Sequence, residues 1–303
     1  MRATVAICTW NRADLLDRTL AEMQRVRIPI GLQWEILVVN NNCTDHTDDV
    51  IAKYKRVLPI RRLFEPDQGL SNARNCAVEA AKGDVLIWTD DDVLVDECWL
   101  EEYCRAAVEY PAVSFFGGRI EPWFDGTPPA WLKAAWQRVD VAYATCNLGE
   151  ECLNFARGKT PFGANFAVRT EVQRRYPYDP SRGRIAREML SGEETAVVSA
   201  MLSDGLSGRW LPEARVRHFI PRHRQTVHYL RSYYEGHGIM MARESGPMTT
   251  VKLLGRPRWL WRAWITSEIQ FRVRRVTSRP EVWIEDLKRA AVLRGMFGAR
   301  PKH

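Results

Sequence analysis

The chain has 303 residues, enough for one large domain or for one domain with an appendage. Apolar residues make up 46% and charged residues 27%, as in an ordinary globular protein, and no apolar run reaches the length of a membrane span. The net charge of +7 suits an anionic partner. Because no recognised nucleic-acid module is visible, an anionic substrate or membrane surface is favoured over nucleic acid.

The first third of the sequence alternates short apolar strands with amphipathic helices. We predict strands at 4–8, 35–39 and 60–64 and from 84, and helices at 13–25, 47–56, 70–81 and about 96–110. This alternation predicts an α/β fold with an open, mostly parallel, Rossmann-like sheet. Ligands of such sheets bind beyond the carboxyl ends of the strands, which here carry the loops after Cys8, Val39 and Trp88.

The pattern changes after residue 110. We predict strands at 113–120, 163–169, 209–211 and 214–218, a helix over 191–205, and helices from about 226 onward. Residues 122–162 are rich in Trp and Pro and read as a long irregular loop, a feature that is usually functional. We therefore expect a domain over 1–222 and a helical, basic extension over 223–303.

Three consecutive carboxylates, Asp90, Asp91 and Asp92, end the apolar strand. An ionised carboxylate is costly to bury alone, so these side chains must face water, a cation or a ligand. A hard divalent cation shared with a diphosphate fits this need. A solvated turn with helix-capping acids is the alternative that these residues leave open.

Seven short segments in a fixed order carry more information than any one of them alone. They are CTWNR (8–12), VVNNNCTD (38–45), GLSNARNCAVEAAKGD (69–84), WTDDDV (88–93), GANFAVR (163–169), GEET (192–195) and RHF (217–219). In this order the chain resembles, over about residues 3–220, the family 2 glycosyltransferases of the GT-A (nucleotide-diphospho-sugar transferase) fold. The similarity is greatest to the bacterial group that makes cell-surface polysaccharides and glycolipids.

The resemblance implies a metal-dependent, inverting transfer of a sugar from a nucleotide-diphosphate sugar to a glycan or lipid-linked acceptor. Residues 1–110 would then form the nucleotide-binding half of the catalytic domain and residues 111–222 the half with the acceptor and base. The residues that the resemblance assigns to the nucleotide-sugar are Thr9, Asn11, Arg12, Asn40, Arg74, Asn75, Asp90 and Asp91.

Asn40 stands where relatives often carry an Asp that accepts a hydrogen bond from uracil N3. An Asn carbonyl accepts this bond too, which favours UDP over GDP or dTDP as the donor nucleotide. A turn residue that is bonded to its own backbone is the alternative for Asn40.

The resemblance also places a divalent metal, Mn²⁺ or Mg²⁺, on Asp92, with Asp90 and His218 as further ligands. Such a cation stabilises the charge on the diphosphate leaving group. Inversion needs one base for the acceptor hydroxyl. In relatives the second acid of the pair usually acts as base, so Glu194 is expected in this role, with Glu193 in reserve. From the residues alone, both acids could simply favour the start of a helix.

The segment 256–275 interleaves aromatic and cationic side chains: Trp259, Trp261 and Trp264 alternate with Arg256, Arg258 and Arg262. This composition suits the boundary between water and lipid. We therefore expect peripheral contact with an anionic membrane, while packing on the catalytic domain or on a second subunit of a homo-oligomer stays open.

The seven cysteines form no CxxC pair and are odd in number, and the N-terminus has too short an apolar stretch for a signal peptide. These features predict reduced thiols and a cytoplasmic protein. Membrane contact through the segment 256–275 would hold this protein at the inner face of the cytoplasmic membrane.

Two other functions fit part of the sequence. A sugar-1-phosphate nucleotidyltransferase would carry a Gly-rich N-terminal signature, which residues 1–12 lack. A non-catalytic nucleotide-sugar-binding protein would not need the acids at 90–92 and 193–194.

Overall fold

The computed structural model describes residues 1–156, 160–180, 193–244, 252–253 and 256–298. The chain divides into two compact units. Unit 1 contains Met1–Trp123 and the described parts of 144–186 and 191–219. Unit 2 contains Phe124–Tyr143 and the described residues from Ile220 onward.

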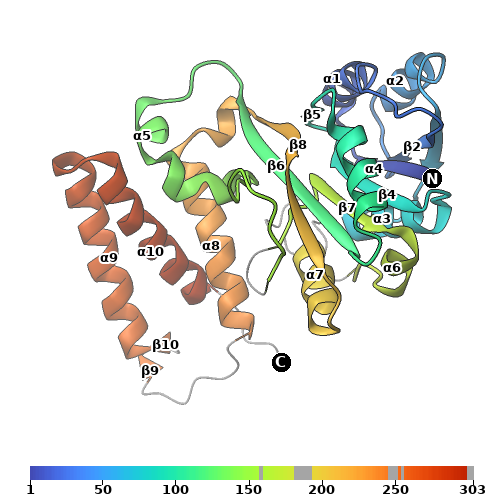
Figure 1. Cartoon of the computed structure of the whole chain (residues 1–303). Helices are drawn as coiled ribbons and strands as arrows, with labels where there is room; N and C mark the ends of the chain where they lie inside the picture. The colour runs from blue at the N-terminus through green and yellow to red at the C-terminus, as the bar shows by residue number, and fades with distance from the viewer. Residues whose placement is uncertain (157–159, 181–192, 245–251, 254–255, 299–303) are drawn as a thin grey trace. The chain divides into compact units, whose positions relative to one another are not determined.

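Within the described residues, unit 1 is built on one sheet of eight strands in the order β3-β2-β1-β4-β7-β6-β8-β5 (Figure 1). The strands are β1 (Arg2–Thr9), β2 (Gln33–Asn40), β3 (Ile60–Phe64), β4 (Val85–Asp90), β5 (Val93–Val95), β6 (Phe115–Phe124), β7 (Asn165–Arg169) and β8 (Gly208–Ile220). Strands β3, β2, β1 and β4 are parallel, whereas β7 is antiparallel to β4 and β6, and β5 to β8. The predicted α/β class is confirmed, with a sheet that is parallel in its first half and mixed beyond it.

The two central parallel strands, β1 and β4, are almost entirely buried because they are continuous apolar strands between neighbouring strands and helices. The helices of unit 1 are α1 (Ala13–Met23), α2 (Thr47–Tyr54), α3 (Leu70–Ala80), α4 (Trp99–Glu109), α6 (Thr170–Arg175) and α7 (Glu193–Ser203). In the register of the sheet Thr9 pairs with Asn40, and Cys8 pairs with Asp90. The carboxyl ends of β1, β2 and β4 therefore meet at one edge.

Asn165 joins the two halves of the sheet. Its Oδ1 accepts hydrogen bonds from Trp99 Nε1 at 2.7 Å and from the Tyr103 hydroxyl at 2.8 Å. Its Nδ2 donates to the carbonyls of Arg119 at 2.9 Å and of Ala214 at 2.7 Å. One fully buried amide thus ties α4 to β6, β7 and β8, and this explains the Asn of the GANFAVR segment.

Some elements differ from the sequence prediction. The two strands predicted at 209–211 and 214–218 form the single strand β8, which runs through Pro212. Strand β5 pairs with Val216–His218 of β8 and does not reach Pro212. Proline has no backbone N–H to donate, and the edge of β8 that faces β5 needs no such donor at this position. The stretch predicted to be irregular contains α5 (Ala130–Val139) and a 3-10 turn, η1 (Asp140–Tyr143). Strand β5 and helix α6 were not predicted.

Unit 2 is helical, as predicted for the C-terminal extension. Its further elements are η2 (Arg222–Arg224), α8 (Val227–Glu244), β9 (Lys252–Leu253), β10 (Arg256–Pro257), α9 (Arg258–Thr277) and α10 (Pro280–Gly298). Helix α10 packs on both α8 and α9 (Figure 1). The backbones of α8 and α10 meet at two glycines: a Cβ on Gly238 would lie 2.0 Å from the Val292 carbonyl oxygen, and one on Gly295 1.9 Å from that of Glu235.

The core of unit 2 also contains Leu132, Ala135 and Val139 of α5, together with Leu230, Ile284 and Leu287 of the C-terminal helices. A helix from the predicted 111–222 half therefore belongs to the same compact unit as the C-terminal helices. Within the described residues, none of the helices combines the length and the apolar character that crossing a membrane demands.

Candidate functional site

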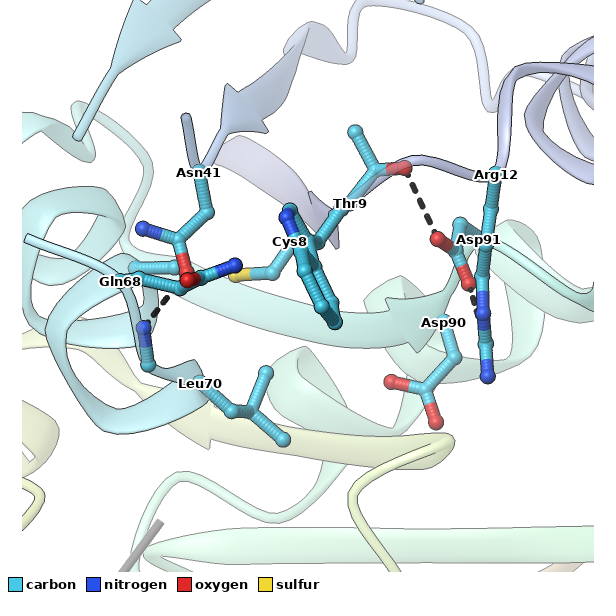
Figure 2. A pocket seen from close by; sticks show the side chains of 11 residues that line it. Cys8, Thr9, Arg12, Asn41, Gln68, Leu70, Asp90 and Asp91 are labelled. Carbon is cyan, nitrogen blue, oxygen red and sulfur yellow. Dashed lines mark hydrogen bonds and ion pairs between the residues drawn. The ribbon is translucent and has the colours of Figure 1, made fainter. Parts of the chain in front are cut away.

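Asp91 is bound by Thr9, the last residue of β1, and by Arg12, which follows that strand. Thr9 Oγ1 donates to Asp91 Oδ2 at 2.8 Å, and Arg12 Nη1 donates to Asp91 Oδ1 at 2.9 Å (Figure 2). The same Arg12 nitrogen lies 2.9 Å from Asp92 Oδ2. The structure thus places the predicted residues Thr9 and Arg12 beside Asp91 and Asp92, and both carboxylate oxygens of Asp91 have protein partners. Contact of these residues with a nucleotide-sugar stays a prediction.

Burial makes these carboxylates costly to ionise. It raises the pKa of Asp91 to about 6, even though the Arg12 guanidinium works in the opposite direction. Burial also raises the pKa of Asp90, against the attraction of Arg74. Arg12 and Arg74 therefore compensate only part of the cost of burying these ionised carboxylates, and an added cation would further stabilise their ionised form.

Asp92 and His218, far apart in sequence, are brought together by the pairing of β5 with β8. His218 Nε2 lies 3.4 Å from Asp92 Oδ1, and the Phe219 N–H donates to the Asp92 carbonyl at 2.9 Å. In the described part of the chain, no three His, Cys, Asp or Glu side chains converge as a complete metal site. One carboxylate and one imidazole nonetheless fit a cation that takes its other ligands from substrate phosphates and water.

A pocket opens beside these acids at the edge of the sheet. It encloses about 720 Å³ when the open solvent within it is counted, and both polar and apolar side chains line it. Figure 2 shows Asn41, Gln68 and Leu70 on one side and Arg12 and the acids on the other. The lining residues are Cys8, Thr9, Trp10, Arg12, Asn41, Gln68, Gly69, Leu70, Ala73, Asp90 and Asp91.

Seven lining residues were not among the predicted site residues: Cys8, Trp10, Asn41, Gln68, Gly69, Leu70 and Ala73. Trp10 lies inside the CTWNR segment and is 39% exposed, unusual for so large an apolar side chain. Its place directly after β1 was the signal that could have identified it. Gln68 gives no such signal, because its loop precedes α3 and has no regular pattern.

Asn40 and its neighbour play different roles in the turn after β2. Asn40 Oδ1 accepts the Cys43 N–H at 2.8 Å, and its Nδ2 donates to Asp48 Oδ1 at 2.9 Å. Asn41 lines the pocket, and its Oδ1 accepts the Gly69 N–H at 2.8 Å. The amide of Asn40 is thus engaged in its own turn, and its contact with a uracil ring stays a prediction.

Asn11 and Asn75 also hold loops in place. Asn11 Oδ1 accepts the Thr44 N–H at 2.7 Å, which links the loops after β1 and β2. Asn75 makes two bonds with the backbone of Tyr178, donating to its carbonyl at 2.8 Å and accepting its N–H at 2.9 Å. Neither side chain lines the pocket, so their predicted contact with the nucleotide-sugar stays a prediction.

Arg74 meets the two acids at the start of α7. Its Nη1 lies 3.2 Å from Glu193 Oε1 and 3.6 Å from Glu194 Oε2. The guanidinium carbon lies 5.7 Å from the ring centroid of Trp88 and 5.2 Å from that of Tyr178. Burial by itself lowers the pKa of Arg74, but the neighbouring carboxylates, Glu193 foremost, more than offset this and raise it.

Glu194 has an oxygen with unused hydrogen-bonding capacity. Its Oε2 is buried and accepts no hydrogen bond from any described residue. Ser191 and Gly192, where the sequence places the start of this helix, lie outside the described residues. The predicted pair of acids therefore lies together with Arg74 and forms one charged cluster with it.

Comparison with known proteins found relatives that align with most or part of this chain. The chain is 24% identical over 259 residues to succinoglycan biosynthesis protein ExoM of Rhizobium meliloti (strain 1021), spanning 80% of this chain and 75% of ExoM. It is 33% identical over 105 residues to validoxylamine A glucosyltransferase of Streptomyces hygroscopicus subsp. jinggangensis (strain 5008). That match spans 34% of this chain and 25% of the relative.

Two solved structures share the fold. Mannosyltransferase PcManGT from Pyrobaculum calidifontis, in complex with GDP-Man and Mn²⁺, aligns with a TM-score of 0.62 at 15% identity over 98% of this chain and 86% of its own. A fragment of S. aureus TarS in complex with UDP aligns with a TM-score of 0.52 at 14% identity over 98% of this chain and 91% of its own. The family model for glycosyl transferase family 2 matches residues 4–158, just over half of the sequence, so this chain belongs to that family and is a glycosyltransferase.

Proposed function

We propose that this glycosyltransferase is inverting and metal-dependent, and that it transfers a sugar from a nucleotide-diphosphate sugar to a glycan or lipid-linked acceptor of a cell-surface polysaccharide. The observation that carries the mechanism is the buried Oε2 of Glu194, which accepts no hydrogen bond from the described residues. A carboxylate oxygen in this state is suited to accept a proton from a hydroxyl group that approaches it.

In this mechanism the acceptor hydroxyl oxygen attacks the anomeric carbon while Glu194 takes its proton. The bond from the anomeric carbon to the diphosphate oxygen breaks, and the nucleoside diphosphate leaves with that electron pair. A divalent cation, Mn²⁺ or Mg²⁺, supplies positive charge for the leaving diphosphate when it is bound. Asp92 and His218 would hold the cation, with Asp90 at the end of the neighbouring strand β4.

The pocket beside Asp90 and Asp91 is the proposed donor site. Solved structures that share the fold contain UDP, UDP-GlcNAc or GDP-Man, which supports a nucleotide-sugar donor. UDP is favoured from the position of Asn40 in the VVNNNCTD segment, and solved structures of TarS that share the fold contain UDP or UDP-GlcNAc. Residues 1–222 are proposed as the catalytic domain, and the relation to ExoM supports a polysaccharide acceptor.

Helix α9 is proposed to carry a peripheral contact with the anionic inner face of the cytoplasmic membrane. Two of the three tryptophans expected there pack on α10 instead, since the Trp261 and Trp264 rings lie 4.3 Å and 5.8 Å from the ring of Phe297. The exposed face of α9 carries apolar and cationic side chains at helical spacing. They are Arg258, Arg262, Ile265, Ile269, Arg272, Val273 and Val276.

Arg272 of this face is paired with Glu268 at 3.1 Å. The face attracts anionic lipid and repels a second copy of itself through the positive charges of Arg258 and Arg262. The membrane is therefore the favoured partner over a homo-oligomer that uses α9.

The products of the reaction test the proposed function. The protein is incubated with Mn²⁺ and each of UDP-glucose, UDP-galactose, UDP-N-acetylglucosamine and GDP-mannose, with and without a membrane extract as a source of acceptor. Release of nucleoside diphosphate that rises with the extract, with inversion at the anomeric carbon seen by NMR, supports the proposal. Consumption of sugar-1-phosphate and nucleoside triphosphate with release of pyrophosphate would instead identify a nucleotidyltransferase.

A further inference from the structure

Three segments that lie far apart in sequence converge on the guanidinium of Arg74. Arg74 comes from α3, Glu193 from the first turn of α7, and Gly163 from the stretch before β7. The Arg74 side chain is 4% exposed and that of Glu193 is 3% exposed, so their ion pair is removed from water.

The Arg74 guanidinium faces the carboxylates of Glu193 and Glu194, and its distances to the two carboxylates differ. Glu193 accepts a hydrogen bond from Arg74 at 3.2 Å, whereas the Glu194 oxygen lies 3.6 Å from the same nitrogen and is not hydrogen-bonded to it. The Glu194 side chain is also more exposed, at 15% against 3%. Arg74 is thus hydrogen-bonded to Glu193 and not to Glu194, and the Glu194 side chain is the more exposed of the two.

Gly163 provides the space for this arrangement. A Cβ at position 163 would lie 2.3 Å from Arg74 Nη2 and 3.1 Å from its Cζ. The guanidinium has little freedom to retreat, because it packs against the rings of Trp88 and Tyr178. A methyl group at position 163 would therefore displace the guanidinium from Glu193.

A buried ion pair of this kind is a poor source of stability, because removing two charges from water costs about as much as their attraction returns. Its geometry is more informative than its energy. We propose that Arg74 is a positioning residue. Its guanidinium, for which Gly163 leaves room because glycine has no side chain, binds Glu193 as its counter-ion and thereby orients Glu194 to take the acceptor proton. This inference rests on the proposed function, and it assigns Arg74 to the base rather than to the nucleotide.

The kinetic test uses the full-length protein with whichever nucleotide-sugar of the panel above it turns over. Arg74→Gln and Gly163→Ala should each lower kcat by about a hundredfold, the scale of a reacting group misplaced by about 1 Å. The Kd for UDP with Mn²⁺, measured by calorimetry, should stay within about twofold of the wild type. Arg74→Lys should restore part of kcat, since it restores the charge without the planar fork. Arg119→Gln is the matched control, a buried arginine that pairs with Glu150 instead, and should keep normal kcat.

A double-mutant cycle supplies a readout that needs no substrate. In an Arg74→Ala background the methyl group of Gly163→Ala enters the vacated space, so its effect on the urea midpoint of unfolding should shrink to less than half. Equal effects in both backgrounds, or a loss of UDP affinity in Arg74→Gln with kcat preserved, would overturn the inference. Full activity of Glu194→Gln would instead count against the proposed function on which this inference rests. So would a failure to release nucleoside diphosphate from any nucleotide-sugar of the panel.

Discussion

Asp91 gives the metal-free protein a pH dependence whose sign is unusual for an acid in an ion pair. Burial raises the pKa of this carboxyl from 3.8 to about 6, although Arg12 opposes the change. The folded state therefore binds a proton that the unfolded state has already released in this interval. The free energy of unfolding loses a contribution as the pH rises from about 4 through 6, and the difference in pKa corresponds to about 3 kcal/mol.

Asp91→Asn isolates this contribution, because an amide has nearly the same shape and does not titrate. Its carbonyl oxygen can still accept the hydrogen bond from Thr9. Urea unfolding of the metal-free wild type and of the variant, measured at half-unit steps from pH 3.5 to 7.5, gives the difference in free energy of unfolding directly. Relative to that of the wild type, the free energy of unfolding of the variant should rise by about 3 kcal/mol from the low to the high end of this pH range.

Carboxyls that do not interact with Asp91 contribute equally to both proteins and cancel in this difference, whereas the charge of Asp92 acts on Asp91 and its titration is included in the difference. A difference that stays constant with pH, or that changes in favour of the wild type as the pH rises, would refute the reasoning from burial.

Three further predictions follow from the site and from α9. Glu194→Gln should keep the wild-type Kd for UDP with Mn²⁺ but lose at least about a hundredfold in kcat; a crippled Glu193→Gln beside an active Glu194→Gln would reverse the two roles. Asp92→Ala should lose most of the Mn²⁺-dependent part of UDP binding in calorimetry while its far-UV circular dichroism stays unchanged, and undiminished binding would rule out the metal ligand. Replacing Ile265 and Ile269 by Ser should weaken sedimentation with anionic vesicles, which added salt should also weaken for the wild type; equal retention on neutral vesicles would point to a protein partner instead.

The sequence predicted the elements that depend on local pattern and missed those that depend on distant partners. The strand expected from residue 84 begins one residue later as β4 (Val85–Asp90), because a buried parallel strand is apolar along most of its length. The continuity of β8 through Pro212 was not predicted, because it depends on how far β5 extends along it.

The same distinction applies to the candidate site. The order of motifs identified residues that do lie near one another, such as Asp92 and His218. It could not show that Asn75 bonds to the backbone of Tyr178, 103 positions away, or that Trp261 packs on Phe297. Periodicity identifies the face of a helix, but only the folded chain determines what covers that face.

The composition of unit 2 bears on how this protein can be shortened. Because α5 belongs to that unit, a cut near residue 222 would remove Leu230, Ile284 and Leu287 and leave the apolar face of α5 uncovered. Such a truncated protein would be prone to aggregate even if its catalytic machinery were complete. A soluble minimal enzyme would instead require a short polar linker in place of 124–143 as well as removal of the C-terminal helices.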